Sequence, residues 1–186
     1  MRIAVYSGSF DPLHKGHKAI MEYLSGSSLF DWVYLVISPQ NPFKDASKAL
    51  TGERRYLAAI EAVGRWPDLR VRVDDIELNM EPPSYTIRTL DALKEREPQN
   101  DFTLVMGADN LGSIRLWKDY RRILNEYGIA VYPRRGFDAR NLLEDLLKDP
   151  DNNYRIRMID APIIDISSTE IREREAAGQD MSAYLM

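Results

Sequence analysis

The sequence contains no cysteine, which excludes disulfide bridges and thiolate metal sites. It has no apolar run long enough to cross a membrane, and its first residues lack the pattern of a secretion signal, so we expect a cytoplasmic protein. An excess of positive charge is also missing. The formal net charge is −4, which argues against a broad nucleic-acid-binding surface. We therefore expect no membrane or nucleic-acid partner, and a few local Lys and Arg side chains must hold any polyanionic ligand.

The composition is that of an ordinary globular protein. Of the 186 residues, 44% are hydrophobic and 29% are charged. This length suits one domain with a sizeable core. No internal repeat, low-complexity tract or linker divides the chain, so we expect residues 1–186 to form a single domain.

Short apolar runs alternate with amphipathic segments along the chain. The runs that predict buried strands are residues 3–5, 31–38, 71–73, 102–106, 129–132 and 155–159. Helices are predicted between them, and one that begins after Thr51 should turn Leu57, Ile60 and Val63 toward the core. This order predicts an α/β fold with a doubly wound, Rossmann-like and mostly parallel sheet of about five to six strands. Ligands should bind beyond the carboxyl ends of these strands.

The most informative stretch joins the first predicted strand to the first predicted helix. Residues 6–17 read Tyr-Ser-Gly-Ser-Phe-Asp-Pro-Leu-His-Lys-Gly-His, and His14 and His17 are the only histidines in the protein. Gly8 and Gly16 allow close backbone approach to a ligand, and the exposed N–H groups at a helix start favour anions. These features predict an anion site. The alternative is a purely structural strand–turn–helix, in which the histidines only cap the helix or pack in the core.

Two segments resemble the signatures of the nucleotidyltransferase superfamily, whose members adenylylate small phosphorylated acceptors. Residues 9–17 match (T/S)-F-D-P-x-H-x-G-H, and residues 166–172 match I-S-S-T-x-I-R. Ser167 or Ser168 would also suit the N-cap of a helix, and the two readings can hold together. In the family reading, these N–H groups and hydroxyls bind phosphate oxygens while Arg172 adds a fixed charge.

Three further segments resemble the branch of this superfamily that uses nicotinate mononucleotide. They are Ser-Tyr-Thr at 84–86 with Thr89 and Leu90, Gly107-x-Asp109 with Trp117, and Pro-x-x-Pro-x-Lys at 39–44. Considered by itself, Trp117 is predicted to lie in the core, and stacking on a pyridine ring is the functional alternative. Two residues depart from the family pattern. Ser7 stands where a glycine is common, and Arg88 stands where an acidic residue is frequent.

The resemblance implies a reaction and a site. ATP would give its AMP moiety to nicotinate mononucleotide, forming nicotinate adenine dinucleotide and pyrophosphate for NAD biosynthesis, with Mg²⁺ bound mainly by phosphates and water. The residues implied for ATP are Gly8, Ser9, Phe10, His14, His17, Asp109, Arg134, Ser167, Ser168 and Arg172. Those implied for the acceptor are Ser9, Lys44, Ser84, Tyr85, Thr86 and Trp117. The implied catalytic residues are His14, His17, Lys44 and Arg172, and protonation near neutral pH would strengthen the histidine contacts.

Several alternatives stay open. An adenylyltransferase of the same superfamily could act on phosphopantetheine or nicotinamide mononucleotide, and a non-catalytic nucleotide-binding regulator would share the fold. A zinc site at His14 and His17 would need further ligands, which the motif does not supply. The sequence does not separate Arg134 from its neighbour Arg135 as the phosphate contact. It also leaves a homo-oligomer open.

Overall fold

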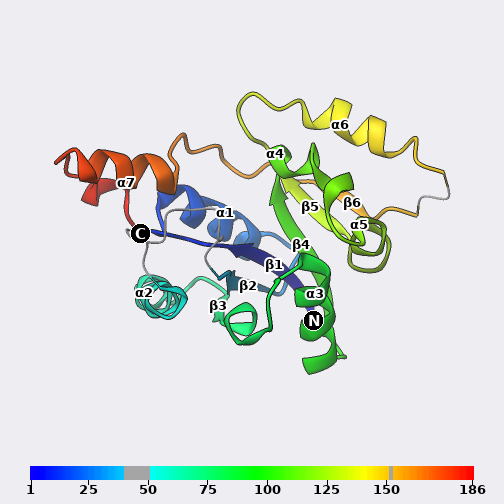
Figure 1. Cartoon of the computed structure of the whole chain (residues 1–186), viewed down its shortest axis with the longest axis horizontal. Helices are drawn as coiled ribbons and strands as arrows, with labels where there is room; N and C mark the ends of the chain where they lie inside the picture. Colours follow the sequence, from blue (N-terminus) through cyan, green and yellow to red (C-terminus); the bar gives the residue numbers. More distant parts are fainter. Residues whose placement is uncertain (40–50, 151–152) are drawn as a thin grey trace.

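The computed structural model describes residues 1–39, 51–150 and 153–186. In this part of the chain, six parallel strands form one sheet in the order β3-β2-β1-β4-β5-β6 (Figure 1). The strands are β1 (Arg2–Gly8), β2 (Trp32–Ile37), β3 (Val71–Asp74), β4 (Asp101–Gly107), β5 (Ile129–Tyr132) and β6 (Ile156–Met158). The predicted fold class and strand number are confirmed.

Helices connect these strands in chain order. They are α1 (Lys15–Gly26), α2 (Gly52–Gly64), α3 (Thr86–Arg96), α4 (Ala108–Leu111), α5 (Tyr120–Arg122), α6 (Ala139–Leu146) and α7 (Ser168–Ala176). Short 3-10 or π turns are η1 (Ile76–Asn79), η2 (Ile114–Leu116), η3 (Ile123–Tyr127) and η4 (Ser182–Tyr184). The sheet grows outward from β1 in both directions, so the carboxyl ends of β1 and β4 flank the switch point where ligands bind in such sheets. Among the described residues, no helix is long and apolar enough to cross a membrane.

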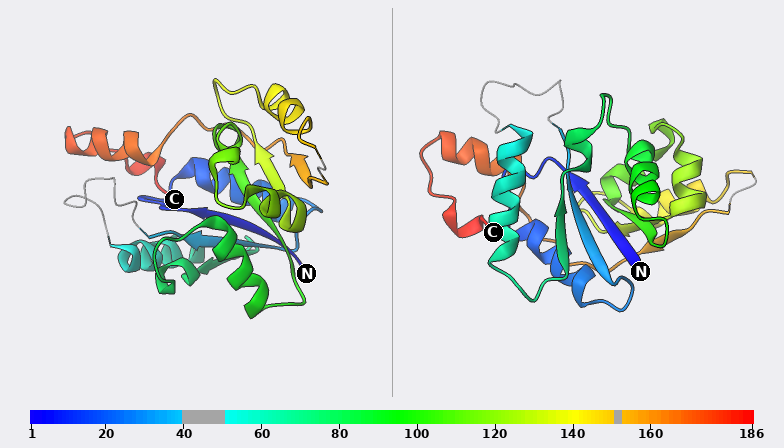
Figure 2. Two further views of the ribbon diagram at one scale, coloured as in Figure 1. Left: turned by 45° about the vertical axis from the view of Figure 1, so that its right-hand side comes forward. Right: turned by 90° about the horizontal axis from the view of Figure 1, so that it is seen from below.

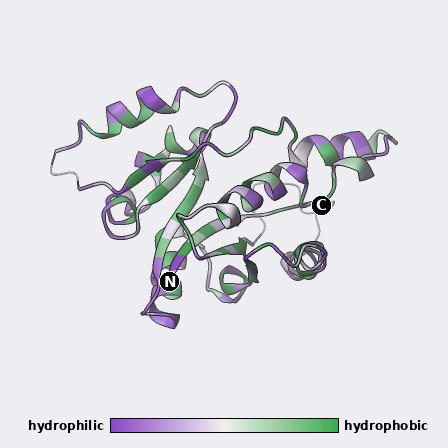
Figure 3. Cartoon of the chain, turned by 180° about the vertical axis from the view of Figure 1, so that it is seen from behind, coloured by the Kyte–Doolittle hydropathy of each residue, from purple (hydrophilic) through white to green (hydrophobic). Residues whose placement is uncertain are grey.

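Alternate residues of β1 face opposite sides of the sheet. Ala4 and Tyr6 belong to the apolar cluster that includes α1 and α2, whereas Ile3 and Val5 belong to the cluster that includes α3. The right-hand view of Figure 2 shows α1 and α2 on one side of the strands and α3 on the other. Burial on both sides explains why the strands read as apolar runs, and they are mostly green, the hydrophobic colour, in Figure 3.

Helix α2 corrects one prediction. Thr51 caps it as expected, because its Oγ1 accepts from the N–H of Arg54 over 3.3 Å. However, Leu57 and Ile60 are 63% and 44% exposed, so their predicted burial is wrong. The helix is turned so that the Arg55 guanidinium reaches backbone carbonyls at the carboxyl edge of the sheet. The buried residues are therefore Arg55, Ala59, Ala62 and Val63.

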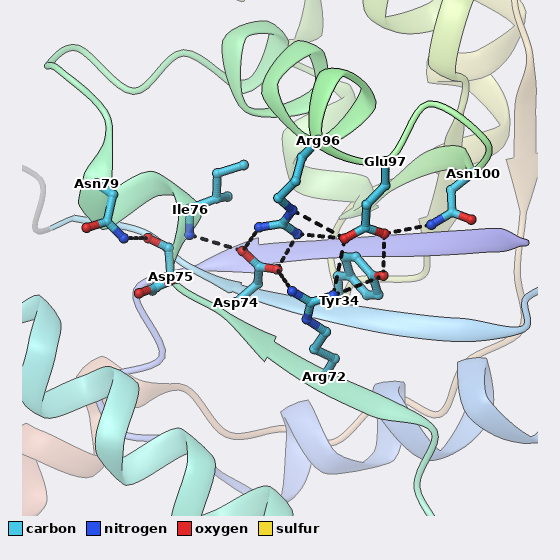
Figure 4. Close-up of polar contacts among 9 residues, drawn as sticks. All are labelled: Tyr34, Arg72, Asp74, Asp75, Ile76, Asn79, Arg96, Glu97 and Asn100. Carbon is cyan, nitrogen blue, oxygen red and sulfur yellow. Dashed lines mark hydrogen bonds and ion pairs between the residues drawn. The ribbon is translucent and has the colours of Figure 1, made fainter.

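A polar cluster ties the end of α3 to β2 and β3 (Figure 4). The guanidinium of Arg96 makes two bonds to Asp74, one of 2.6 Å, and the Asp74 side chain is only 1% exposed. The hydroxyl of Tyr34 donates to Glu97 over 2.7 Å, and Arg72 pairs with both carboxylates. Breaking such a bidentate contact would leave a buried charge unpaired, which is strongly unfavourable. The cluster therefore holds the end of α3 against β2 and β3, and Asp74 also accepts from the N–H of Ile76 at the start of η1.

Candidate functional site

The turn between β1 and α1 lies at the centre of the candidate site. β1 ends at Gly8, and Phe10 adopts a φ of +46°, a left-handed conformation that is uncommon outside glycine. The Phe10 ring is buried, and its centroid lies 5.2 Å from that of Tyr6 and 5.0 Å from that of His17. A cis peptide bond joins Asp11 to the next residue. The buried ring anchors the turn from the inside.

The two histidines form a reciprocal cap at the start of α1. His14 is the N-cap residue, and its Nδ1 accepts from the N–H of Gly16 over 3.1 Å. The N–H of His14 donates to Nδ1 of His17 over 3.3 Å, and the ring centroids are 3.6 Å apart. Because each Nδ1 is an acceptor, each neutral ring carries its proton on Nε2. The capping role is therefore real, and it leaves each ring with one further N–H donor.

The glycines of this stretch serve the protein's own rings. A Cβ placed on Gly16 would lie 2.9 Å from the His14 ring, and one placed on Gly8 would lie 3.1 Å from the Phe10 ring. The sequence suggested that these glycines make room for a ligand. In the structure, the space beside each is filled by an aromatic side chain that must pack there.

The surroundings of both histidines favour the neutral ring. Burial lowers the pKa of His14 to about 4, helped by the positive charge of Arg134. Burial also lowers the pKa of His17 well below its usual value, with smaller contributions from His14 and Arg134. Desolvation and a nearby cation both disfavour the imidazolium, so protonation of either histidine near neutral pH would need the opposing negative charge of a bound phosphate.

A shallow hollow, partly open to solvent, lies beyond the carboxyl ends of β1 and β5. It brings together residues that are far apart in the sequence. Its lining includes Tyr6, His14, His17, Tyr132, Arg134 and Ile164. The hollow lies at the sheet edge that the alternating strand pattern predicted for ligands.

Arg134, and not Arg135, faces this hollow. Arg135 lies on the surface, 76% exposed at its side chain, and pairs with Asp165 over 2.7 Å. Arg134 follows β5, and its Nε is 3.6 Å from Oδ1 of Asp109, which is too long for a hydrogen bond. That Oδ1 is buried without any hydrogen-bond partner in the described chain. A Cβ on Gly107 would come within 2.3 Å of the same oxygen, so only glycine permits this arrangement.

The start of α7 is docked against the turn that precedes α1. Ser167 is the N-cap residue, and its Oγ accepts from the N–H of Glu170 over 3.1 Å. Ser168 donates to the carbonyl oxygen of Pro12 over 3.0 Å, and Arg172 donates to that of Asp11. Figure 1 shows α7 beside α1 at this end of the sheet. The two signature segments of the sequence therefore form one structural unit.

The segments predicted to bind the acceptor adjoin each other at the start of α3. Nζ of Lys118 lies 5.0 Å from the Tyr85 ring centroid, which brings Trp117 and its neighbours to this helix start. Trp117 is half-buried and packs against the core, so the core reading holds for one side of its ring. Ser84 Oγ is buried without a partner in the described chain, and Tyr85 and Thr86 begin the helix without a side-chain cap.

The departure at Arg88 has a local explanation. Its guanidinium donates to the carbonyl oxygens of Glu81 and Pro83 over 2.9 and 2.8 Å. It therefore fixes the turn that leads into α3. Lys44 lies outside the described residues. Among those described, no group of three or more His, Asp or Glu side chains could hold a metal ion.

Sequence reasoning missed two buried charges next to these segments. Arg55 donates to the carbonyl oxygens of Ser9 and Ser38, and Glu77 accepts from Ser7 and Thr89. Arg55 could have been found from its spacing of four and seven residues before two alanines, which suits a close-packed helix face. Glu77 lies in a short 3-10 turn that offers no such periodicity.

Comparison with known proteins identifies the family of the chain. A family model described as cytidylyltransferase-like matches residues 5–174. A probable nicotinate-nucleotide adenylyltransferase of Flavobacterium johnsoniae is 35% identical over 185 residues, which is 100% of this chain and 92% of the relative. One of Bacteroides fragilis is 38% identical over 184 residues, or 99% and 87% of the two chains.

The fold of the chain is also similar to that of a solved structure. The Plasmodium falciparum nicotinic acid mononucleotide adenylyltransferase complexed with NaAD is 21% identical, with a TM-score of 0.81 over 99% of this chain and 90% of that chain. At that identity the likeness supports the fold alone. From the family model and the full-length relatives, the chain belongs to the cytidylyltransferase-like family and, within it, to the nicotinate-nucleotide adenylyltransferases.

Proposed function

We propose that this enzyme transfers AMP from ATP to the 5′-phosphate of nicotinate mononucleotide, forming nicotinate adenine dinucleotide for NAD biosynthesis. An acceptor phosphate oxygen attacks the α-phosphorus of ATP, and pyrophosphate leaves. The acceptor is already an anionic nucleophile, so alignment and charge stabilisation suffice and no covalent enzyme intermediate is needed. The observation that carries the proposal is the convergence of His14, His17 and Arg134 in one hollow beyond the carboxyl ends of β1 and β5.

We infer the ATP-binding part of the site from the hydrogen-bond donors at the carboxyl ends of the strands. The Nε2–H groups of His14 and His17 donate to ATP phosphates, and Arg134 and Arg172 supply positive charge. The unpartnered Oδ1 of Asp109 supports a contact with a ribose hydroxyl or the adenine. We assign the backbone of Gly8, Ser9 and Phe10, the start of α7 at Ser167 and Ser168, and Lys44 to the same phosphates.

The acceptor side lies at the start of α3. We assign the pyridine ring to a place beside Trp117, whose indole can stack on a flat, electron-poor ring. The N–H groups near Tyr85 and Thr86 would receive its carboxylate, since a helix start favours an anion. The buried, unpartnered hydroxyl of Ser84 supports a polar ligand group at this point. Ser9 and Lys44 complete the proposed acceptor contacts.

Mg²⁺ is the cofactor that we propose to accompany ATP. It prefers six oxygen ligands, and the described residues supply no carboxylate cluster for it. The triphosphate and water would therefore hold the ion, whose charge helps to neutralise the transferring group. We also propose that the chain acts in the cytoplasm as a single domain on small molecules, which its net charge of −4 favours over nucleic acid.

A panel of acceptors tests the proposal directly. Pyrophosphate release should be measured with nicotinate mononucleotide, nicotinamide mononucleotide and phosphopantetheine. The amide would leave a carboxylate-binding N–H unsatisfied, at a cost of about 1–3 kcal/mol, so the acid should be favoured roughly ten- to a hundredfold in kcat/KM. Equal efficiency with acid and amide would refute the carboxylate pocket. Faster reaction with phosphopantetheine would change the acceptor, and no release with any acceptor would favour a regulator.

Substitution of Trp117 tests the acceptor pocket separately. Trp117→Ala should raise KM for nicotinate mononucleotide and leave KM for ATP nearly unchanged. The variant also removes core contacts, so its melting temperature should fall. Trp117→Phe is the matched control, because it keeps an aromatic face at this position. Parallel increases in KM for both substrates would indicate that Trp117 acts only through the core.

A further inference from the structure

Arg55 is a buried cation next to the turn between β1 and α1, which we propose to bind phosphate, and it is not among the proposed ligand contacts. It lies in the first turn of α2 and is only 2% exposed. Its Nη1 donates to the carbonyl oxygen of Ser9, and its Nη2 donates to that of Ser38 over 2.8 Å. A buried guanidinium is tolerated only when its donors are satisfied. The side chain therefore joins the turn after β1 to the residue that follows β2.

The contact with Ser9 sets the direction of the next N–H group. The peptide bond between Ser9 and Phe10 is trans, because the cis bonds of the described chain lie elsewhere. In a trans peptide, the carbonyl and the following N–H point in opposite directions. Since the Ser9 carbonyl faces Arg55, the Phe10 N–H faces away from it. No described residue accepts a hydrogen bond from this N–H.

Other contacts hold the same turn. Phe10 keeps a left-handed φ of +46°, which costs free energy and persists only where surrounding contacts impose it. Its ring packs against Tyr6 and His17. Burial of Arg55 lowers the pKa of its guanidinium, and the negative charge of the buried Asp11 opposes this effect. The ring contacts of Phe10, the bond from Arg55 to the Ser9 carbonyl and the charge of Asp11 therefore all constrain this turn.

We propose that Arg55 is a positioning residue for ATP, because it fixes the Ser9–Phe10 peptide so that the Phe10 N–H is directed at a phosphate oxygen. Arg55 does not touch ATP in this arrangement. It acts through the backbone, from the side of the turn opposite to the ligand. The inference rests on the proposed function, since it takes this turn as part of the phosphate site.

Binding of a non-hydrolysable ATP analogue, measured by calorimetry, tests the role without turnover. Arg55→Ala should lower its affinity about tenfold or more, the usual effect of losing a charge-assisted hydrogen bond. Affinity for nicotinate mononucleotide should change little. Added guanidinium ion at low concentration should restore part of the lost ATP affinity by refilling the vacated space. Arg54→Ala, an exposed neighbour on the same helix, is the matched control and should bind as the wild type does.

Circular dichroism and thermal melting separate this role from a purely structural one. A folded Arg55→Ala protein with wild-type affinity for the analogue would overturn the proposal. If that variant does not fold, Arg55→Lys decides, because a single ammonium lacks the planar fork that holds both carbonyls. A folded lysine variant with weakened ATP binding supports the role, and one with wild-type binding overturns it. Absence of pyrophosphate formation by the wild type would overturn the proposed function alone.

Discussion

The hydroxyl of Ser7 lies 2.9 Å from Oε1 of Glu77 and 2.9 Å from the hydroxyl of Ser38. Thr89 donates to the same Glu77 oxygen over 3.0 Å, so one buried carboxylate joins the end of β1 to α3. A hydroxyl has one proton to give. Ser7 therefore donates to Glu77 and accepts from Ser38. The serine that replaces the family's common glycine thus links the ends of two strands to the helix that begins the proposed acceptor site.

This relationship predicts a stability effect. Ser7→Ala should destabilise the fold by about 1–3 kcal/mol, because it leaves a buried carboxylate with one donor fewer. In a Glu77→Gln background the same change should cost less, since a neutral amide is easier to leave unsatisfied. Urea denaturation of the four proteins measures the difference. Equal costs in both backgrounds would show that Ser7 and Glu77 are not coupled.

Loss of either histidine should impair turnover without preventing folding. His17→Ala should lower kcat about a hundredfold or more, as removal of a positioned charge-stabilising donor does. His14→Ala should lose as much activity and a further ~1 kcal/mol of stability, because His14 is also the N-cap of α1. His14→Asn keeps a capping acceptor and isolates the kinetic effect. Near-normal turnover of these variants at saturating ATP would remove the phosphate-binding role.

Binding of ATP should be accompanied by proton uptake. Burial lowers the pKa of both histidines, to about 4 for His14, and the negative charge of a bound phosphate would raise both values. The bound state then holds more protons, so ATP affinity should increase as the pH falls from about 7 to about 5. Calorimetry of Mg²⁺-ATP in two buffers of different ionisation enthalpy counts the protons. The His17→Ala variant corrects for the nucleotide's own titration, and equal uptake by both proteins would contradict the prediction.

The adjacent arginines after β5 should behave differently. Arg134→Ala should weaken ATP binding about tenfold or more, because its cation lines the hollow with both histidines. It should also raise the pKa of His14, which Arg134 holds down, as NMR titration can measure. Arg135→Ala is the matched control. Its partner Asp165 is exposed, and such surface pairs contribute little. Similar losses in both variants would contradict the assignment.

The sheet was predictable because its signal is local. A strand buried on both faces must be apolar along its length, and that pattern survives in a single sequence. The inward face of α2 was not predictable by the same means. Leu57 and Ile60 are apolar residues at helical spacing, as expected of a buried face. The bonds from Arg55 to two carbonyls instead direct the face of Arg55 toward the sheet and leave Leu57 and Ile60 exposed.

In the candidate site, too, features set by neighbouring residues could be predicted, whereas features set by distant residues could not. His14 and His17 are three residues apart, so their motif is visible in the sequence. Their lowered pKa values depend on burial and on Arg134, which follows a strand distant in the sequence. The partner of Arg55 is a backbone carbonyl of Ser9, 46 residues away. Every residue carries such a carbonyl, so no side-chain pattern marks which of them a buried guanidinium will reach.

The docking of α7 on the first turn has a consequence for synthesis of the protein. Ser168 donates a hydrogen bond to the carbonyl of Pro12, 156 residues earlier in the chain. The turn before α1 is therefore synthesised first and its partner α7 near the end of translation. All six strands precede α7, and the sheet can assemble before that helix exists. A product released after β6 would contain the histidine turn but lack the contacts of Ser168 and Arg172 that brace it. Early termination would therefore leave sheet-forming fragments that cannot complete the nucleotide pocket.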